Sequence, residues 1–121
     1  MSIIRKEFHF SASHCLEHLP EGHPCTRVHG HNYIVTVELR CKRKRELTEA
    51  GFVQDYRALE HIKKFIDDAL DHKHLNDFLP FNPSAELIAE HLYNLWKEST
   101  PRLWAVEVSE TPKTVARYDA S

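Results

Sequence analysis

The sequence predicts an α+β domain in which two helices cover one face of an antiparallel sheet. Three observations lead to this prediction. Two stretches in the N-terminal third alternate apolar and polar side chains with a period of two, which is typical of strands. Two central stretches repeat apolar side chains at helical spacing, and a further alternating stretch follows them. Strands that are grouped apart from helices favour an α+β architecture.

The two N-terminal strands carry matching apolar stripes. Residues 3–14 alternate so that their stripe ends at His14. Residues 29–41 place two histidines at the start of a stripe: His29, His31, Tyr33, Val35, Val37, Leu39 and Cys41. The other face of this strand carries Asn32, Thr36, Glu38 and Arg40. We expect the two stripes to lie side by side in one sheet.

The middle of the chain predicts two helices. A charged hairpin at 42–51 and a short strand at 52–54 come first. Asp55 is suited to cap a helix that runs to about residue 70. A loop at 71–83 then leads to the second helix, which begins at about residue 84.

Two strands end the chain. Residues 103–110 place four side chains on one face, namely Trp104, Val106, Val108 and Glu110. Residues 114–118 form a short last strand. No repeat or linker divides the sequence, so residues 1–121 are expected to form one domain.

Composition excludes several classes of protein. The 121 residues have a formal net charge of −2, which gives no reason to expect nucleic acid or an anionic membrane as a partner. No apolar run reaches 18 residues, and the N-terminal ten residues lack the character of a signal peptide. The three cysteines favour free thiols in a reducing compartment, so we expect a cytoplasmic protein.

The sequence His29-Gly30-His31 is a candidate metal site. Residues i and i+2 of a strand point the same way about 6.6 Å apart, so two imidazoles can converge on one ion. His14 ends the neighbouring strand and is the natural third ligand. Three neutral nitrogen ligands leave a position open, which is the pattern of catalytic zinc. The alternative is a pair of polar residues at the end of a strand.

Cys25 lies four residues before His29 in a polar loop. A thiol beside a divalent cation has a lowered pKa and can act as a base, as a nucleophile or as a fourth zinc ligand. Burial as a small apolar residue is the usual alternative for a free cysteine.

Asp71-His72 and Glu110 are further candidates. Asp71 can orient His72 as a proton-transfer pair, although a histidine at a helix C-terminus is also favoured by the helix dipole. Glu110 ends an otherwise apolar strand face, so its carboxylate either faces a pocket or is exposed where the strand frays. A pocket carboxylate can accept two parallel hydrogen bonds from a guanidine-like ligand edge.

The order of these motifs resembles the 6-pyruvoyltetrahydropterin synthase family, and within it the bacterial 6-carboxytetrahydropterin synthase branch of queuosine biosynthesis. Five motifs carry the resemblance: His14, Cys25-Thr-Arg-Val-His29-Gly-His31, Leu70-Asp71-His72-Lys73-His74-Leu75-Asn76, Asn82-Pro83-Ser84-Ala85-Glu86 and Glu110-Thr111. The three residues between Cys25 and His29 match the carboxy branch, because the pyruvoyl branch has a longer insertion there.

The resemblance implies a T-fold, an antiparallel four-stranded sheet with two helices on one face, assembled as a homohexamer with active sites between subunits. It implies that Zn²⁺ binds His14, His29 and His31, and that Cys25 is the catalytic thiol. Asp71 and His72 would complete its relay, Glu110 would hold the pterin edge, and Glu86 is a second substrate candidate. The substrate would be the small molecule 7,8-dihydroneopterin triphosphate, and the products 6-carboxytetrahydropterin, acetaldehyde and triphosphate.

Three other readings remain open. A pyruvoyltetrahydropterin synthase would act on the same substrate with the same site. A cupin also uses His-x-His but normally has a glutamate four or five residues after the second histidine, where this chain has Val35 and Thr36. A non-catalytic zinc module would close its site with a fourth ligand, such as Cys25.

Overall fold

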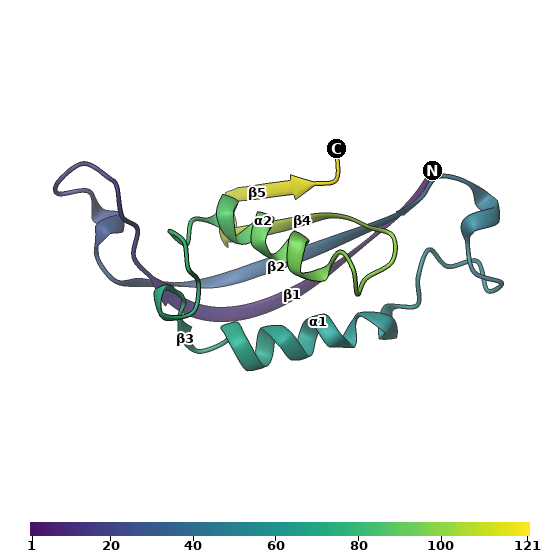
Figure 1. Cartoon of the computed structure of the whole chain (residues 1–121), viewed down its shortest axis with the longest axis horizontal. Coiled ribbons are helices and arrows are strands. Elements are labelled where there is room, and N and C mark those ends of the chain that lie inside the picture. The colour runs from purple at the N-terminus through teal and green to yellow at the C-terminus, as the bar shows by residue number, and fades with distance from the viewer.

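The computed structural model describes residues 1–121 and contains one five-stranded sheet and two helices (Figure 1). The strands are β1 (Ser2–His14), β2 (His29–Cys41), β3 (Lys73–His74), β4 (Leu103–Thr111) and β5 (Thr114–Asp119). Their order in the sheet is β3-β1-β2-β4-β5. The helices are α1 (Glu60–Phe65) and α2 (Ala85–Trp96). The T-fold prediction is therefore confirmed, with one more strand than expected.

β1 and β2 pair without interruption along their whole length. The antiparallel register runs from Ser2 opposite Cys41 to His14 opposite His29. Because both strands keep the period of two, their apolar faces coincide, and the Phe10 and Tyr33 rings stack 4.8 Å apart. The predicted pairing of the two stripes is confirmed.

Both helices pack on this apolar face. Ile62 from α1 and Leu92 from α2 are fully buried, and they belong to one cluster of 22 buried residues that includes the stripe of β2. Burying a large aliphatic side chain contributes roughly 1.5–3 kcal/mol, so packing holds elements as short as α1 that would not be stable alone. Neither helix is long and apolar enough to cross a membrane.

Both helical segments begin with a side-chain cap, and the cap predicted at Asp55 is confirmed. The Asp55 carboxylate accepts a hydrogen bond from the Arg57 amide (2.9 Å), and Ser84 Oγ accepts one from the Leu87 amide (3.2 Å). The first segment is not uniform, because α1 is preceded by a 3₁₀ turn (Tyr56–Leu59) and followed by a π turn (Ile66–Leu70). Together these pieces span the predicted helix.

Three local predictions are wrong. Residues 52–54 form no strand, and Val53 is instead buried in the core from an irregular segment. The predicted loop at 71–83 contains β3, which pairs in parallel with Ala12 and Ser13, so the sheet is not wholly antiparallel.

The third wrong prediction concerns the start of β4. The pairing of β4 with β2 shifts between Glu38 and Leu39, so that Leu103 lies opposite Leu39 and Ala105 lies opposite Glu38. This bulge places Leu103 in the core in the position expected for Trp104. The Trp104 ring instead lies against the Arg40 guanidinium, 4.6 Å from it.

The face of the sheet away from the helices buries a carboxylate. Glu38 is only 4% exposed, and its two oxygens accept hydrogen bonds from Arg5, Arg40 and Arg117. The guanidinium groups of Arg117 and, to a smaller extent, Arg40 lower the pKa of Glu38 to about 2. The polar face predicted for β2 is thus an ordered ion-pair cluster, and not a solvated surface.

Candidate active site

Three histidines meet at one end of the apolar face, as predicted. Ligand nitrogens of His14, His29 and His31 all lie within 4.8 Å of one another. The Nε2 atoms of His14 and His29 are 3.0 Å apart, a separation that an ion at about 2.0–2.1 Å from each nitrogen can bridge. His14 is fully buried, and the other two are half-buried, so the cluster is open on one side.

The strand register brings these histidines together. His14 is the last residue of β1 and His29 is the first residue of β2, and the two are direct partners across the ladder. His31 lies two residues further along β2 and faces Ala12, whose small side chain leaves room beside the cluster. The loop at 15–28 is the connection that turns the chain from one strand into the next.

Hydrogen bonds to main-chain carbonyls orient two of the rings. His14 Nδ1 lies 2.8 Å from the Pro83 carbonyl oxygen, and His29 Nδ1 lies 2.7 Å from that of Arg27. A ring that donates from Nδ1 keeps a lone pair on Nε2 for a metal. The buried Nε2 of His31 has no hydrogen-bond partner. This donor set fits a zinc ion with one open position.

The Glu110 carboxylate reaches the same cluster. Its Oε2 lies 3.0 Å from His31 Nε2, in a geometry that makes no hydrogen bond, and 3.3 Å from His14 Nε2. The contact with His14, more than any other, lowers the pKa of Glu110. Burial alone would lower the pKa of His14, but Glu110 and the Pro83 carbonyl outweigh it, so this pKa is raised. Burial is the main cause that lowers the pKa of His31. Glu110 therefore faces the site and is not frayed.

Cys25 lies in a cavity of about 360 Å³ next to the histidines. Thr111, Thr114, Pro24 and Glu110 line this cavity, together with His29 and His31. Cys25 sits in a 3₁₀ turn (Pro24–Thr26), and its amide donates a hydrogen bond to the His23 ring (3.1 Å). The thiol is half-buried and is not one of the clustered ligands. This position beside the open side of the cluster suits a group that exchanges protons with a bound ligand.

Glu86 lies in the exposed first turn of α2. It borders a second cavity of about 210 Å³ that Glu110 and Thr114 also line. Glu110 and Thr114 are therefore shared by the two cavities, and a flat ligand that reached from Cys25 past Glu110 would approach Glu86.

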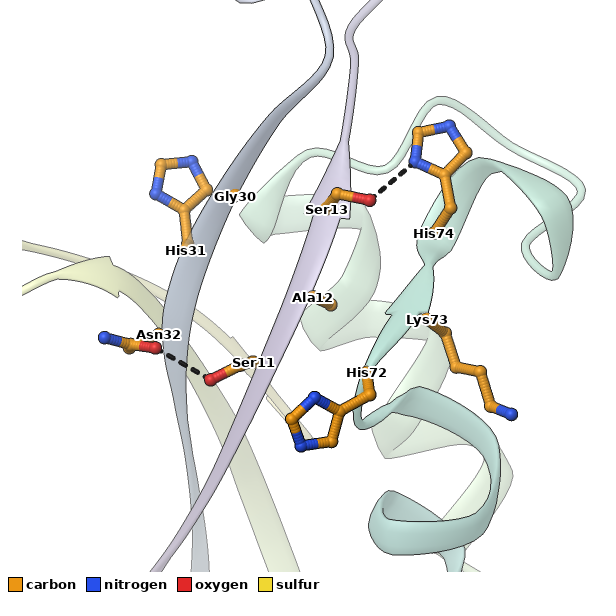
Figure 2. A pocket seen from close by; sticks show the side chains of 9 residues that line it. All are labelled: Ser11, Ala12, Ser13, Gly30, His31, Asn32, His72, Lys73 and His74. Carbon is orange, nitrogen blue, oxygen red and sulfur yellow. Dashed lines mark hydrogen bonds between the residues drawn. The ribbon is translucent and has the colours of Figure 1, made fainter.

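Asp71 and His72 form a pair, but not beside Cys25 of the same chain. His72 Nε2 lies 3.4 Å from Asp71 Oδ2, and the Ser11 amide donates to Asp71 Oδ1 (2.9 Å). His72 adopts a left-handed backbone conformation (φ 59°), and its side chain is 83% exposed. It lines a cavity of about 470 Å³ along the outer face of β1. In Figure 2 its ring points toward Ser11, whereas Lys73 points away from β1.

Sequence reasoning assigned no role to two residues of this site. Tyr33 follows His31 on the same face, and its ring centre lies 5.5 Å from that of His31. Its hydroxyl group is buried without a hydrogen-bond partner, and burial raises its pKa. Thr114 borders the cavities of both Cys25 and Glu86. The alternation of β2 could have indicated Tyr33, whereas the position of Thr114 depends on how β5 folds back.

Comparison with known sequences supports the family that the motifs resemble. The sequence model of the 6-pyruvoyl tetrahydropterin synthase family matches residues 3–121. A 6-carboxy-5,6,7,8-tetrahydropterin synthase of Synechocystis sp. is 40% identical over 98% of this chain and 93% of its own length. The protein of the same name from Haemophilus influenzae is 30% identical over 95% of this chain and 96% of its own.

Solved structures give the same answer for the fold. The 6-pyruvoyl tetrahydropterin synthase of Caenorhabditis elegans superimposes with a TM-score of 0.83 at 27% identity, over 99% of this chain and 96% of that one. A protein from Wolinella succinogenes superimposes with a TM-score of 0.84 at 24% identity, over 99% of this chain and 98% of that one. Sequence, fold and site agree, and the chain belongs to the 6-pyruvoyl tetrahydropterin synthase family of pterin enzymes.

Proposed function

We propose that this protein is a zinc-dependent 6-carboxytetrahydropterin synthase. It would convert 7,8-dihydroneopterin triphosphate to 6-carboxytetrahydropterin, with release of acetaldehyde and triphosphate, in the biosynthesis of queuosine. The observation that carries the proposal is the open three-histidine cluster with Cys25 and Glu110 beside it. The names of the Synechocystis and Haemophilus relatives support the carboxy branch.

The reaction needs no external oxidant or reductant. The substrate side chain has three carbons, of which one stays as the carboxyl group and two leave as acetaldehyde. The side-chain carbon is oxidised while the dihydropterin ring is reduced, so electrons move within one molecule, and water supplies an oxygen. What the enzyme must do is move protons along the side chain and stabilise the negative charge that forms there.

The residues of the site suit these tasks. A zinc ion on His14, His29 and His31 would supply Lewis-acid chemistry to the side-chain oxygens. The Cys25 thiol lies at the wall of the same cavity, where it can accept or return a proton. The Glu110 carboxylate can accept paired hydrogen bonds from the amino and ring N–H edge of the pterin. Glu86 lines the adjoining cavity together with Glu110 and is the second substrate contact that we propose.

We further propose a homohexamer in which Asp71 and His72 serve the Cys25 of a second copy. Within one chain His72 and Cys25 line different cavities, so a single copy does not assemble the relay. The exposed position of His72 leaves it available to a neighbouring subunit. The three unpaired cysteines support the cytoplasm as the location.

The first test is to incubate the zinc-loaded protein with dihydroneopterin triphosphate and to identify the products by mass spectrometry. We expect 6-carboxytetrahydropterin and acetaldehyde, and a loss of at least about 10²-fold in rate for Cys25→Ala. Cys15→Ala is the matched control, because Cys15 is a free cysteine that does not line the cavity. A pyruvoyl product would move the chain to the sister branch, and full activity of Cys25→Ala would refute the role of the thiol.

A further inference from the structure

Two asparagines from the motifs of this chain, Asn76 and Asn82, have no part in the site described above. Each makes a pair of hydrogen bonds with one residue of the loop that follows β1. The Cys15 amide donates to Asn76 Oδ1 (2.9 Å), and Asn76 Nδ2 donates back to the Cys15 carbonyl (2.9 Å). The Glu17 amide donates to Asn82 Oδ1 (2.9 Å), and Asn82 Nδ2 donates to the Glu17 carbonyl (3.2 Å).

This arrangement replaces a partner strand. In an antiparallel ladder, alternate residues exchange both an N–H and a C=O bond with the neighbouring chain. Here two carboxamides provide these groups to Cys15 and Glu17 after β1 itself has ended at His14. A primary amide suits this role because it carries an acceptor and donors on one planar group, whereas a carboxylate cannot donate to a carbonyl.

On its other edge, the segment 15–17 is bonded to the turn that carries Cys25. The amide of Leu16, which lies between Cys15 and Glu17, donates to the Cys25 carbonyl (2.8 Å). The other backbone hydrogen bonds of the loop join residues only three apart: His23 to Pro20, Thr26 to His23 and Arg27 to Pro24. The Leu16 bond is therefore the backbone contact that ties the turn of Cys25 to the start of the loop.

The asparagines themselves are anchored. Leu75 next to Asn76 is fully buried in the core, and Ser84 after Pro83 is the N-cap of α2. The Pro83 carbonyl, adjacent to Asn82, accepts the hydrogen bond that orients His14. The segment 75–84 therefore bonds both the His14 ring and the start of the loop at 15–28.

The geometry points to Asn76 and Asn82 as positioning residues that fix Cys25 relative to the three-histidine cluster. We call the four hydrogen bonds of Asn76 and Asn82 to Cys15 and Glu17 the amide clamp. Its positioning role rests on the proposed function, because it requires Cys25 to be the reacting thiol. The clamp joins the two carboxamides to the main chain of Cys15 and Glu17, and the substitutions leave in place the Pro83 carbonyl that orients His14. It therefore predicts an effect on the placement of the thiol and not on zinc binding by the three histidines.

The test compares Asn76→Asp, Asn82→Asp and the double variant with Asn94→Asp. Each aspartate keeps the shape of the side chain but removes the donor to a carbonyl. Asn94 is the matched control, since it is an exposed asparagine of α2 whose amide donates to Glu90 of its own helix. Asn76→Ser and Asn82→Ser provide neutral replacements in case the added charge prevents folding.

Three quantities are measured on the zinc-loaded variants: kcat and KM, zinc content, and hydrogen exchange at the Leu16 amide. We expect kcat to fall about 10-fold in each single variant and about 100-fold in the double variant, as expected when a catalytic group is displaced by about 1 Å. KM should stay within about threefold, zinc content should be retained, and Leu16 should exchange at least about tenfold faster. The control should match the parent protein.

Two results would overturn the clamp. One is an unchanged exchange rate at Leu16 in the double variant, and the other is faster exchange with an unchanged kcat. If the parent protein does not turn over dihydroneopterin triphosphate, the proposed function fails but the clamp is still tested. In that case the rate of alkylation of Cys25 by iodoacetamide replaces kcat, and equal rates in parent and double variant would refute the clamp.

Discussion

Two glutamates on the same sheet have opposite surroundings. Glu38, on the face away from the helices, accepts hydrogen bonds from three arginines, and its side chain is 6% exposed. Glu110, on the helix face at the histidine end, has only histidines as ion-pair partners, and its side chain is 23% exposed. A carboxylate whose bonds are all taken by fixed cations is part of the structure. One that faces imidazole rings and a cavity has bonding capacity left for a ligand.

The largest expected effect, on zinc content and turnover, is that of replacing His29 in the three-histidine cluster. In His29→Ala we expect zinc to be lost and turnover to fall by about 10³-fold or more, because two nitrogens no longer hold the ion in place. Zinc analysis and the product assay measure this, with circular dichroism as a check on folding. His9→Ala is the control, since His9 is exposed on the other face of β1. Retained zinc in His29→Ala would contradict the three-ligand site.

Glu38→Gln should affect stability and not turnover. The arginines hold the pKa of Glu38 at about 2, against an ordinary value of 4.5, so its ionised form stabilises the folded state by about 3 kcal/mol above pH 4.5. This contribution is lost as the pH falls from 4.5 toward 2. Urea unfolding at pH 7 and pH 3 should show a gap between parent and variant that shrinks at the lower pH.

The control for this prediction is Glu49→Gln at an exposed position. A gap that is independent of pH would mean that the cluster acts by packing and not by charge. A loss of turnover at low urea concentration would remove the contrast with Glu110.

Glu110→Gln should show the reverse pattern. We expect turnover to fall about 10²-fold, because the amide can accept only one of the paired hydrogen bonds and carries no charge. The free energy of unfolding should change by less than about 1 kcal/mol, since the Glu110 side chain is partly exposed at an open cavity and pairs with no arginine or lysine. The ratio kcat/KM and urea unfolding give the two numbers, with the exposed Glu98→Gln as control. If both glutamates proved equally destabilising when replaced, the comparison would fail.

The smallest expected effect is that of Gly30→Ala, between His29 and His31. Gly30 has no positive φ, and an added Cβ would lie 3.5 Å from the Ala12 carbonyl oxygen, which is an ordinary contact. Glycine weakens a strand, so alanine should leave stability within about 0.5 kcal/mol or raise it slightly. Thermal unfolding measures this. A marked loss of stability would show that the outer face of β2 is packed more tightly than these distances indicate.

The two long strands were predictable from the sequence because their signal is local. The alternation of β2 gives its bounds and its histidine face, and the Asp55 cap gives the start of the first helical segment. The bulge that exchanges Trp104 for Leu103 was not predictable, because it depends on how β4 fits against β2. β3 is only two residues long and exists through its pairing with β1, so it leaves no periodic pattern.

The site was predictable in the same uneven way. The grouping of His14, His29 and His31 follows from strand period and matching stripes, and the structure confirms it. The Glu38 cluster remained hidden, since its arginines come from β1, β2 and β5 and share no motif. The separation of His72 from Cys25 also depends on the turn after α1, whose left-handed residue gives no sequence signal when it is not a glycine.

The direct pairing of His14 with His29 also concerns folding. A slip of β1 against β2 by one residue would turn one stripe over and carry its histidines to the opposite face. Such a misaligned hairpin could not offer three nitrogens to one ion. A metal that binds only the native alignment stabilises it by mass action. Bound zinc would therefore favour the native strand register over misaligned ones during folding.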